Sequence, residues 1–216
     1  MSNYGNAFFS PESKQYPGSV VPVWLEVKER KIAGGTIDIS GYSKGDIIPA
    51  GIPVNLPKMG GSATLLDAFT VVGAVSATDT TLVLKSASGV LKDPSGLVVG
   101  KVTETTGIAA KAVELGDGTA SSSAGHEGEY SFTIVANSLG VLSDGDTLYL
   151  ISAAGSNKAV LKPTGLSWRQ IYIDSDNATV GTVAVVTKGQ VLADRIPAIS
   201  DYFKSMMPGI TFEYES

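Results

Sequence analysis

Short apolar runs separated by glycine-containing turns extend along most of this chain and constrain its fold more than any other feature. Glycine accounts for 25 of the 216 residues, and Asp-Gly and Gly-Asp pairs recur between runs rich in Val, Thr, Ile, Leu and Ala. Branched residues favour strands, and these pairs favour tight turns. Hydrophobic residues make up 43% and charged residues 17%, the opposite of the balance in disordered chains. The sequence therefore predicts a folded, mainly β protein of many short strands.

An internal repeat occupies residues 80–162. The segment 81–99 aligns without a gap with 132–150 at an offset of 51, and both copies contain Gly-Val-Leu. Each copy is predicted to form two strands joined by turns. A unit of this size buries its apolar face poorly alone, whereas two units packed together bury it well. Chance similarity between two hairpins is the alternative. The polar, glycine-rich stretch 116–129 between the copies is predicted to be an exposed loop.

A weaker similarity links the two sides of this repeat. Lys-Gly and Ile-Pro recur at the same spacing in 44–54 and in 188–198. These segments predict one β domain, a split barrel or sandwich formed by residues 20–78 and 164–216. The pair of repeat units, 80–162, is then an insertion, which a host domain tolerates when the two inserted ends lie close together at a surface loop.

The two ends of the chain depart from the strand pattern. Residues 1–19 combine four aromatic side chains with polar residues and two prolines, without a strand or helix period, and this predicts an extended N-terminal arm. Near the C-terminus, apolar residues recur at helical spacing within 197–207, which predicts one short helix packed on the core. Pro208-Gly209 ends that helix, and a final strand is predicted over 210–214.

The residue types that carry catalysis or metal binding are scarce. The only histidine, His126, lies in a glycine-rich stretch that provides no rigid platform for a catalytic side chain. The chain has no cysteine, which excludes thiolate zinc sites and a cysteine nucleophile. Asp174 begins a stretch that resembles a calcium loop, but Thr179 and Val185 stand where the loop needs glycine and glutamate. We therefore expect no enzyme, no cofactor and no metal site.

Charge and hydropathy bear on the partners of the chain. The formal net charge is −5, and basic residues group only over 28–31, so we expect no direct contact with nucleic acid. Residues 1–6 contain no basic region, and the early apolar run 20–27 is short and interrupted by Pro22 and Glu26. These features predict neither a signal peptide nor a membrane span. The expected place of synthesis is the cytoplasm of the producing cell.

The segment 45–54, GDIIPAGIPV, resembles a phrase found in the head decoration and head-fibre proteins of tailed bacteriophages. The ending of the chain, 185–212, also resembles the end of phage head-fibre proteins. The likeness covers 35–80 and 165–216 but not the repeat. It implies a β-rich virion structural protein on the exterior of the capsid, made in the host bacterial cytoplasm, with the major capsid protein as its partner. It also implies a homotrimer without catalytic residues.

The aromatic residues of the arm are the candidate capsid-binding residues, namely Tyr4, Phe8, Phe9 and Tyr16. Aromatic rings in a polar arm need a surface against which they can be buried, and a floppy terminus is the alternative.

Two other function classes stay open. One is an enzyme of unfamiliar type, which the missing acid–base pair disfavours most. The other is a carbohydrate-binding or adhesin β module whose partner is a host surface glycan or receptor. Trp24 and Trp168 are the candidate stacking residues for a sugar, although single tryptophans in alternating strands more often belong to the core.

Overall fold

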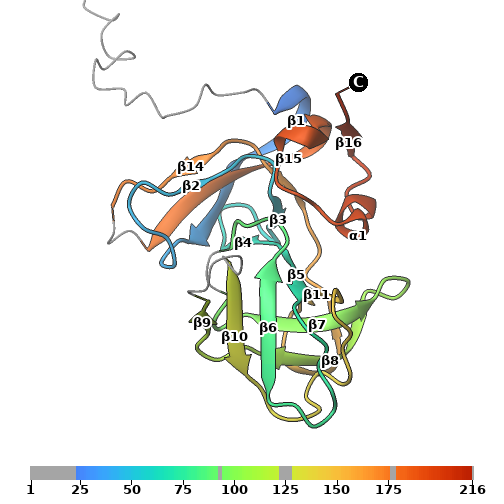
Figure 1. The fold of residues 1–216 in the computed structure, drawn as a ribbon. Helices are drawn as coiled ribbons and strands as arrows, with labels where there is room; N and C mark the ends of the chain where they lie inside the picture. The colour runs from blue at the N-terminus through green and yellow to red at the C-terminus, as the bar shows by residue number, and fades with distance from the viewer. Residues whose placement is uncertain (1–22, 92–93, 122–127, 176–178, 216) are drawn as a thin grey trace, which may run out of the picture.

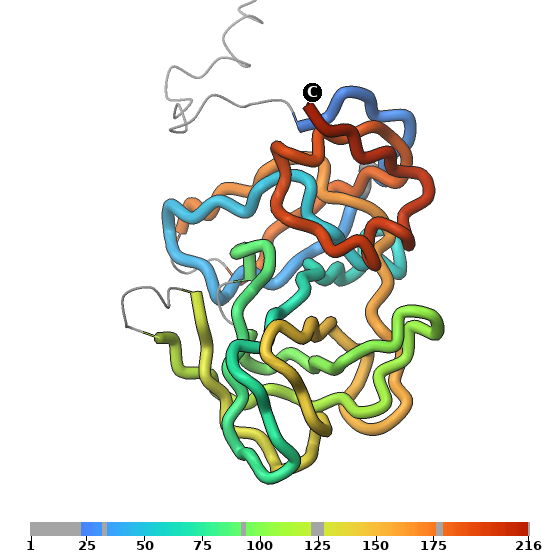
Figure 2. Tube along the Cα trace, turned by 45° about the vertical axis from the view of Figure 1, so that its right-hand side comes forward, coloured from blue at the N-terminus to red at the C-terminus, as the bar shows by residue number. Residues whose placement is uncertain are grey.

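The computed structural model describes residues 23–91, 94–121, 128–175 and 179–215, and it confirms a mainly β fold with one short α-helix among these residues. The strands form a six-stranded sheet and an eight-stranded sheet, which lie at opposite ends of the molecule (Figures 1 and 2). A pair of short strands, β2 (Ile47–Ile48) and β14 (Ile171–Tyr172), lies beside the first sheet (Figure 1).

The six-stranded sheet has the order β1-β15-β13-β3-β4, with β16 parallel to the second half of β15. Hydrogen bonds also connect the segment just before β4 with β1. The Thr36 N–H of β1 donates to the Gly61 carbonyl at 3.0 Å, and the Ala63 N–H donates to the Thr36 carbonyl at 2.7 Å. β1 is one long strand whose pairing with β15 has register shifts between Trp24 and Gly35. The bounds are β1 Trp24–Asp38, β3 Pro53–Asn55, β4 Thr64–Leu65, β13 Gly165–Ser167, β15 Val180–Leu192 and β16 Ile210–Glu213.

The eight-stranded sheet has the order β12-β8-β7-β11-β5-β6-β10-β9 and is antiparallel throughout. The predicted boundary at 78–80 falls between β5 and β6, which are paired in this one sheet. The bounds are β5 Ala68–Val71, β6 Thr81–Ser86, β7 Val98–Thr103, β8 Ile108–Glu114, β9 Thr119–Ala120, β10 Glu129–Thr133, β11 Thr147–Leu150 and β12 Gly155–Ala159.

The strands of the sequence repeat pair with each other, β6 with β10 and β7 with β11. The offset of 51 holds for the second strands, where Val99 and Leu150 are both buried. In the first strands the same offset aligns buried Leu82 with exposed Thr133. The residue that matches Leu82 in burial is Phe132, one position earlier. Because strand faces alternate with a period of two, a shift of one residue exchanges the buried and exposed sides. The gapless alignment is therefore wrong for the first strands.

Asp67 lies between β4 and β5, where the chain passes from one sheet to the other, and only 3% of it is exposed. Its carboxylate accepts hydrogen bonds from the hydroxyls of Ser86 and Ser88 and from the backbone N–H groups of Ala68 and Ser88. Burial raises the pKa of Asp67, and the hydrogen bonds from the two serines oppose that rise. The carboxylate thus holds the turn after β6 against the crossover between the sheets.

That turn also packs on the six-stranded sheet. Val90, 6% exposed, belongs to the apolar cluster that contains Ile37, Val54 and Val185. The Tyr42 hydroxyl donates to the Val90 carbonyl at 2.9 Å. In the second repeat copy the residue at the same place is 70% exposed Val141. The two copies therefore differ at this position, where only the first one packs on the six-stranded sheet.

The C-terminal segment makes a third connection between the two sheets. The helix α1, Asp201–Ser205, begins after Ser200, whose side chain accepts a hydrogen bond from the Phe203 N–H. Tyr202 and Phe203 each pack edge-on against Tyr149 of β11, with ring centroids 5.2 Å apart. The chain then returns to the six-stranded sheet through β16. Residue Ser200 has an extended backbone, so the helix is shorter than the predicted 197–207.

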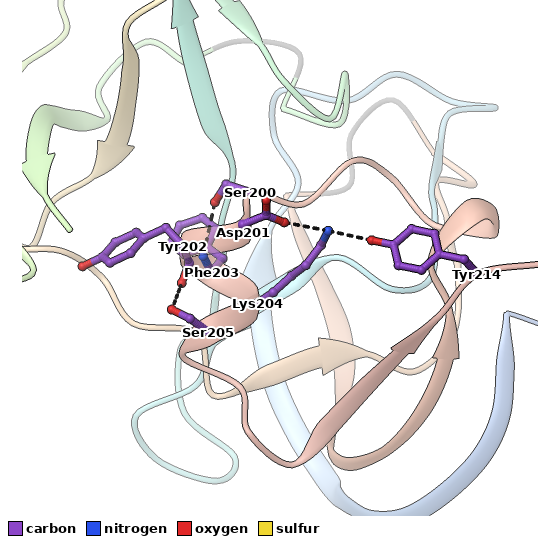
Figure 3. A network of polar contacts seen from close by, with 7 residues as sticks. All are labelled: Ser200, Asp201, Tyr202, Phe203, Lys204, Ser205 and Tyr214. Carbon is purple, nitrogen blue, oxygen red and sulfur yellow. Dashed lines mark hydrogen bonds and ion pairs between the residues drawn. The ribbon is translucent and has the colours of Figure 1, made fainter. Parts of the chain in front are cut away.

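Lys204 links this helix to Tyr214 near the end of the chain. Its Nζ lies 3.0 Å from Asp201 Oδ1 and 3.1 Å from the Tyr214 hydroxyl (Figure 3). The hydrogen bond with Tyr214 raises the pKa of Lys204, and the bond with Asp201 acts in the same direction against burial. The last described residues are thus fixed to α1. A short η1 turn, Ala193–Arg195, precedes this region.

The two segments that carry the phage resemblance contact each other. Gly51 has a φ of +82°, and a Cβ atom added to it would lie 2.2 Å from Ile196 Cγ2. Gly45 also has a positive φ, +95°, but lies in open space. Gly189, which the sequence similarity equates with Gly45, lies inside β15 and pairs with Val27. The similarity between 44–54 and 188–198 is therefore not a structural repeat.

A substitution at Gly51 should test this contact against a matched control. Gly51→Ala combines a left-handed backbone with a clash and should lower the free energy of unfolding by about 2–4 kcal/mol. Gly45→Ala carries only the backbone cost, about 1–2 kcal/mol. Urea unfolding of the two variants measures both values. Equal losses would show that the contact with Ile196 does not constrain the fold.

The raised pKa of Asp67 predicts a pH dependence. The folded state holds the Asp67 proton more tightly than the unfolded state, so this contribution to stability is complete below the ordinary pKa of 3.8 and is lost as the pH rises through the folded pKa. Asp67→Asn keeps two hydrogen-bonding atoms without the charge. The stability of the wild type relative to this variant should fall as the pH rises from 3.8, measured by urea unfolding. Parallel stability curves would contradict the predicted shift.

Candidate binding surface around Trp168

The residues predicted to bind the capsid, Tyr4, Phe8, Phe9 and Tyr16, lie outside the described residues, and so does His126. Their predicted roles therefore stay predictions. In the described ranges, no three histidine or acidic side chains are placed to share a metal ion. No helix in the described part of the chain has the length and apolar character needed to cross a bilayer.

One motif was missed by sequence reasoning. Residues 41–45 read Gly-Tyr-Ser-Lys-Gly, the Gly-x-Ser-x-Gly pattern that marks the nucleophilic serine of many hydrolases. That motif requires a strand followed by a helix, whereas here a tight turn leads into β2. The Ser43 N–H donates to Asp46 Oδ2 at 2.8 Å, and Ser143 and Asp146 form the same turn without the pattern. Residues 41–45 therefore form a structural turn.

The two tryptophans meet beside the six-stranded sheet. The Trp168 N–H donates to the Ala184 carbonyl of β15, and its carbonyl accepts from Trp24 Nε1, both at 2.9 Å. Both side chains are half-buried and pack against a small apolar cluster that includes Leu166 and Val186. Each tryptophan side chain therefore belongs to the core only in part, and the rest of it is exposed.

Two arginines cover the indole of Trp168. The guanidinium carbon of Arg30, on β1, lies 3.7 Å from the ring centroid, and that of Arg169 lies 3.9 Å from it. At these distances each guanidinium covers one face of the ring, so the two groups lie on opposite faces. The attraction between a cation and an aromatic face stabilises both contacts. We name Trp24, Arg30, Trp168 and Arg169 the Trp168 surface.

The acidic residues nearest to Arg30 along β1 have other partners. Glu29 pairs with Lys188 at 2.7 Å, and this hydrogen bond, together with one from Thr187, lowers the pKa of Glu29. Glu26 pairs with Lys28 at 3.2 Å. Within the described residues, neither Arg30 nor Arg169 forms an ion pair with a carboxylate.

This arrangement determines what the surface can bind. A guanidinium that stacks on a ring keeps the N–H groups at its edge, which form paired hydrogen bonds with carboxylates or phosphates. Both faces of Trp168 are already covered, so a sugar ring has no free face of this indole on which to stack. The Trp168 surface is therefore suited to anionic groups.

The surface includes the start of the described chain. Val23 is the first described residue and precedes Trp24, so the segment predicted as an arm, 1–19, comes shortly before this surface in the sequence. The start of β1 is at the end of the molecule that is distant from the eight-stranded sheet (Figures 1 and 2). Leu25, beside it, is exposed.

Neither a model of a protein family, nor a curated protein, nor a solved structure matches this chain. Any proposal of function therefore depends on the geometry above and on the sequence resemblance.

The charge around Trp168 predicts its response to ionic quenchers. Trp24→Phe leaves Trp168 as the only tryptophan, because the chain contains two. Two guanidinium groups attract anions and repel cations, so the ratio of iodide to caesium quenching should exceed that of N-acetyltryptophanamide free in solution. Adding Arg30→Gln and Arg169→Gln should bring this ratio close to that of the free compound. A ratio in the Trp24→Phe variant equal to that of the free compound would show that the arginines do not cover the ring in solution.

Proposed function

We propose that this chain is a virion structural protein, a head-fibre or decoration protein bound to the exterior of a tailed-phage capsid. One observation carries the proposal beyond the sequence resemblance. The predicted aromatic arm shortly precedes Trp24 of the Trp168 surface in the sequence, and the eight-stranded sheet lies at the opposite end of the molecule from the start of β1 (Figure 1). A protein that attaches to a shell at one end and projects from it at the other needs this polarity.

The six-stranded sheet suits the attached end. We interpret the hydrogen bonds between 60–63 and β1 as closing it into a small split barrel around Ile37, Val54 and Val185. A closed sheet leaves few unpaired strand edges, and such edges are the usual sites of unwanted association. A particle that carries many copies of one protein benefits from this protection.

The arm explains why the proposal includes a homotrimer. Burying one aromatic ring of the arm contributes roughly 1.5–3 kcal/mol. Ordering each residue of the arm costs about 1–2 kcal/mol, so one arm binds the major capsid protein weakly. Three arms on one trimer raise the effective concentration of each further contact and can strengthen binding on the order of a hundredfold.

The alternative, a carbohydrate-binding or adhesin module, has less support from the described residues. Stacking a sugar requires a free aromatic face, and both faces of Trp168 are covered by arginine side chains. Tyr214, the one aromatic among the exposed large hydrophobic side chains in the described part of the chain, is hydrogen-bonded to Lys204. A thermal shift of the protein with a host glycan would favour the alternative.

Deleting residues 1–18 tests the proposed attachment. The variant should keep the melting temperature of the full chain, because the three apolar clusters of the described residues are formed without residues 1–18. Its binding to capsids purified without this protein should fall sharply. Phe8→Ser with Phe9→Ser should reproduce most of the loss, and His126→Ala, as a control, should leave binding unchanged. Decoration by the truncated chain at the wild-type concentration would contradict an anchoring role of the arm.

A further inference from the structure

We propose that Arg30 and Arg169 form a binding site for an extended acidic segment of a partner protein, with one carboxylate on each guanidinium. This site adds the chemistry of the partner to the proposed function. Only the identity of the partner, a capsid protein, rests on that proposed function. The binding chemistry itself depends on the Trp168 surface.

The fold assembles this site from distant parts of the chain. The sequence contains three arginines, and two of them stack on the same ring. Arg30 comes from β1, whereas Arg169 follows β13, and the pairing of both strands with β15 brings them together. The Trp168 backbone is hydrogen-bonded on both sides, to Ala184 and to Trp24, so the ring between the arginines is held in place.

The free donors of both arginines favour carboxylates. A planar guanidinium forms two parallel hydrogen bonds with a carboxylate, and stacking fixes the plane in which these bonds form. The neighbouring acids Glu26 and Glu29 are paired with lysines, so they do not occupy these donors. The site is thus preorganised, which lowers the entropy cost of binding.

The spacing of the two guanidinium groups favours an extended peptide. They lie at 3.7 and 3.9 Å from one centroid on opposite faces of the ring. Side chains two residues apart on one face of a strand are separated by about 7 Å, which matches this arrangement. Acidic residues at positions i and i+2 of an extended segment could therefore each reach one arginine.

A protein segment fits the surroundings better than nucleic acid. A long polyphosphate needs many cations along its path, whereas the two paired glutamates on β1 and the net charge of −5 oppose its approach. Two arginines suffice for a short acidic segment.

The test uses the full chain and a capped peptide of alternating Asp and Ser, titrated at low ionic strength with tryptophan fluorescence as the readout. The same peptide with Asn in place of Asp is the ligand control. Arg30→Gln with Arg169→Gln should weaken binding of the acidic peptide at least about tenfold, because it removes both charge-assisted pairs. Lys31→Gln, the matched control on the same strand, should change the affinity less than about twofold.

Lysine substitutions separate charge from geometry. Arg30→Lys with Arg169→Lys keeps both charges but loses the planar fork, and it should lose most of the affinity as well. Unchanged melting temperatures of all variants confirm that the fold is intact. Because no capsid enters this experiment, its result is independent of the decoration test.

Three results would overturn the proposal. The first is the absence of peptide binding by the wild type, and the second is equal binding by the double Gln variant. The third is inorganic phosphate binding as tightly as the peptide with the same dependence on the arginines, which would indicate a site for a small oxyanion. If the peptide result holds and capsids do not bind the protein, the proposed function fails and the acidic-segment site stands.

Discussion

The buried carboxylate of Asp67 connects the two sheets, and the arrangement of the remaining structure depends on it. The chain crosses between the sheets at this residue, and the hydroxyls of Ser86 and Ser88 bind the same carboxylate. That bond fixes the turn after β6, which places Val90 in the core of the six-stranded sheet. The helix α1 makes the reciprocal contact, from the other end of the chain, against Tyr149. Because a buried polar group is costly unless it is fully hydrogen-bonded, this junction favours one relative placement of the sheets.

A fixed junction gives the molecule two distinct ends. At one end the Trp168 surface adjoins the start of β1, because Trp24 is hydrogen-bonded to Trp168, and β16 lies at the same end (Figure 1). The other end consists of loops of the eight-stranded sheet, where Val135 and Val141 are exposed. The proposed function uses the first end for attachment to the capsid, so the eight-stranded sheet projects away from it. A flexible junction would weaken this argument, because the two ends would then take no fixed direction.

Local sequence patterns predicted the fold class, but they did not predict how distant strands pair. The Gly-Asp turns and branched runs predicted a mainly β chain because turn and strand preferences are local. The register of β6 against β10 depends on which face is buried, and a similarity of sequence does not specify it. Ser200 shortens the predicted helix by capping it. The Trp168 surface was not predicted because Arg30 and Arg169 are far apart in the sequence and come together only through the pairing of β1 and β13 with β15. The one signal in the sequence was the small number of arginines.

The central claim is that this chain attaches to a capsid through several weak arms that act together, and the number of chains in the free protein tests it most directly. Native mass spectrometry of the purified full chain measures that number without a capsid or a ligand. The account predicts a stable complex of three chains, because a single arm binds too weakly to hold the protein on a shell. A single chain at micromolar concentration would contradict the account and would favour an independent binding module.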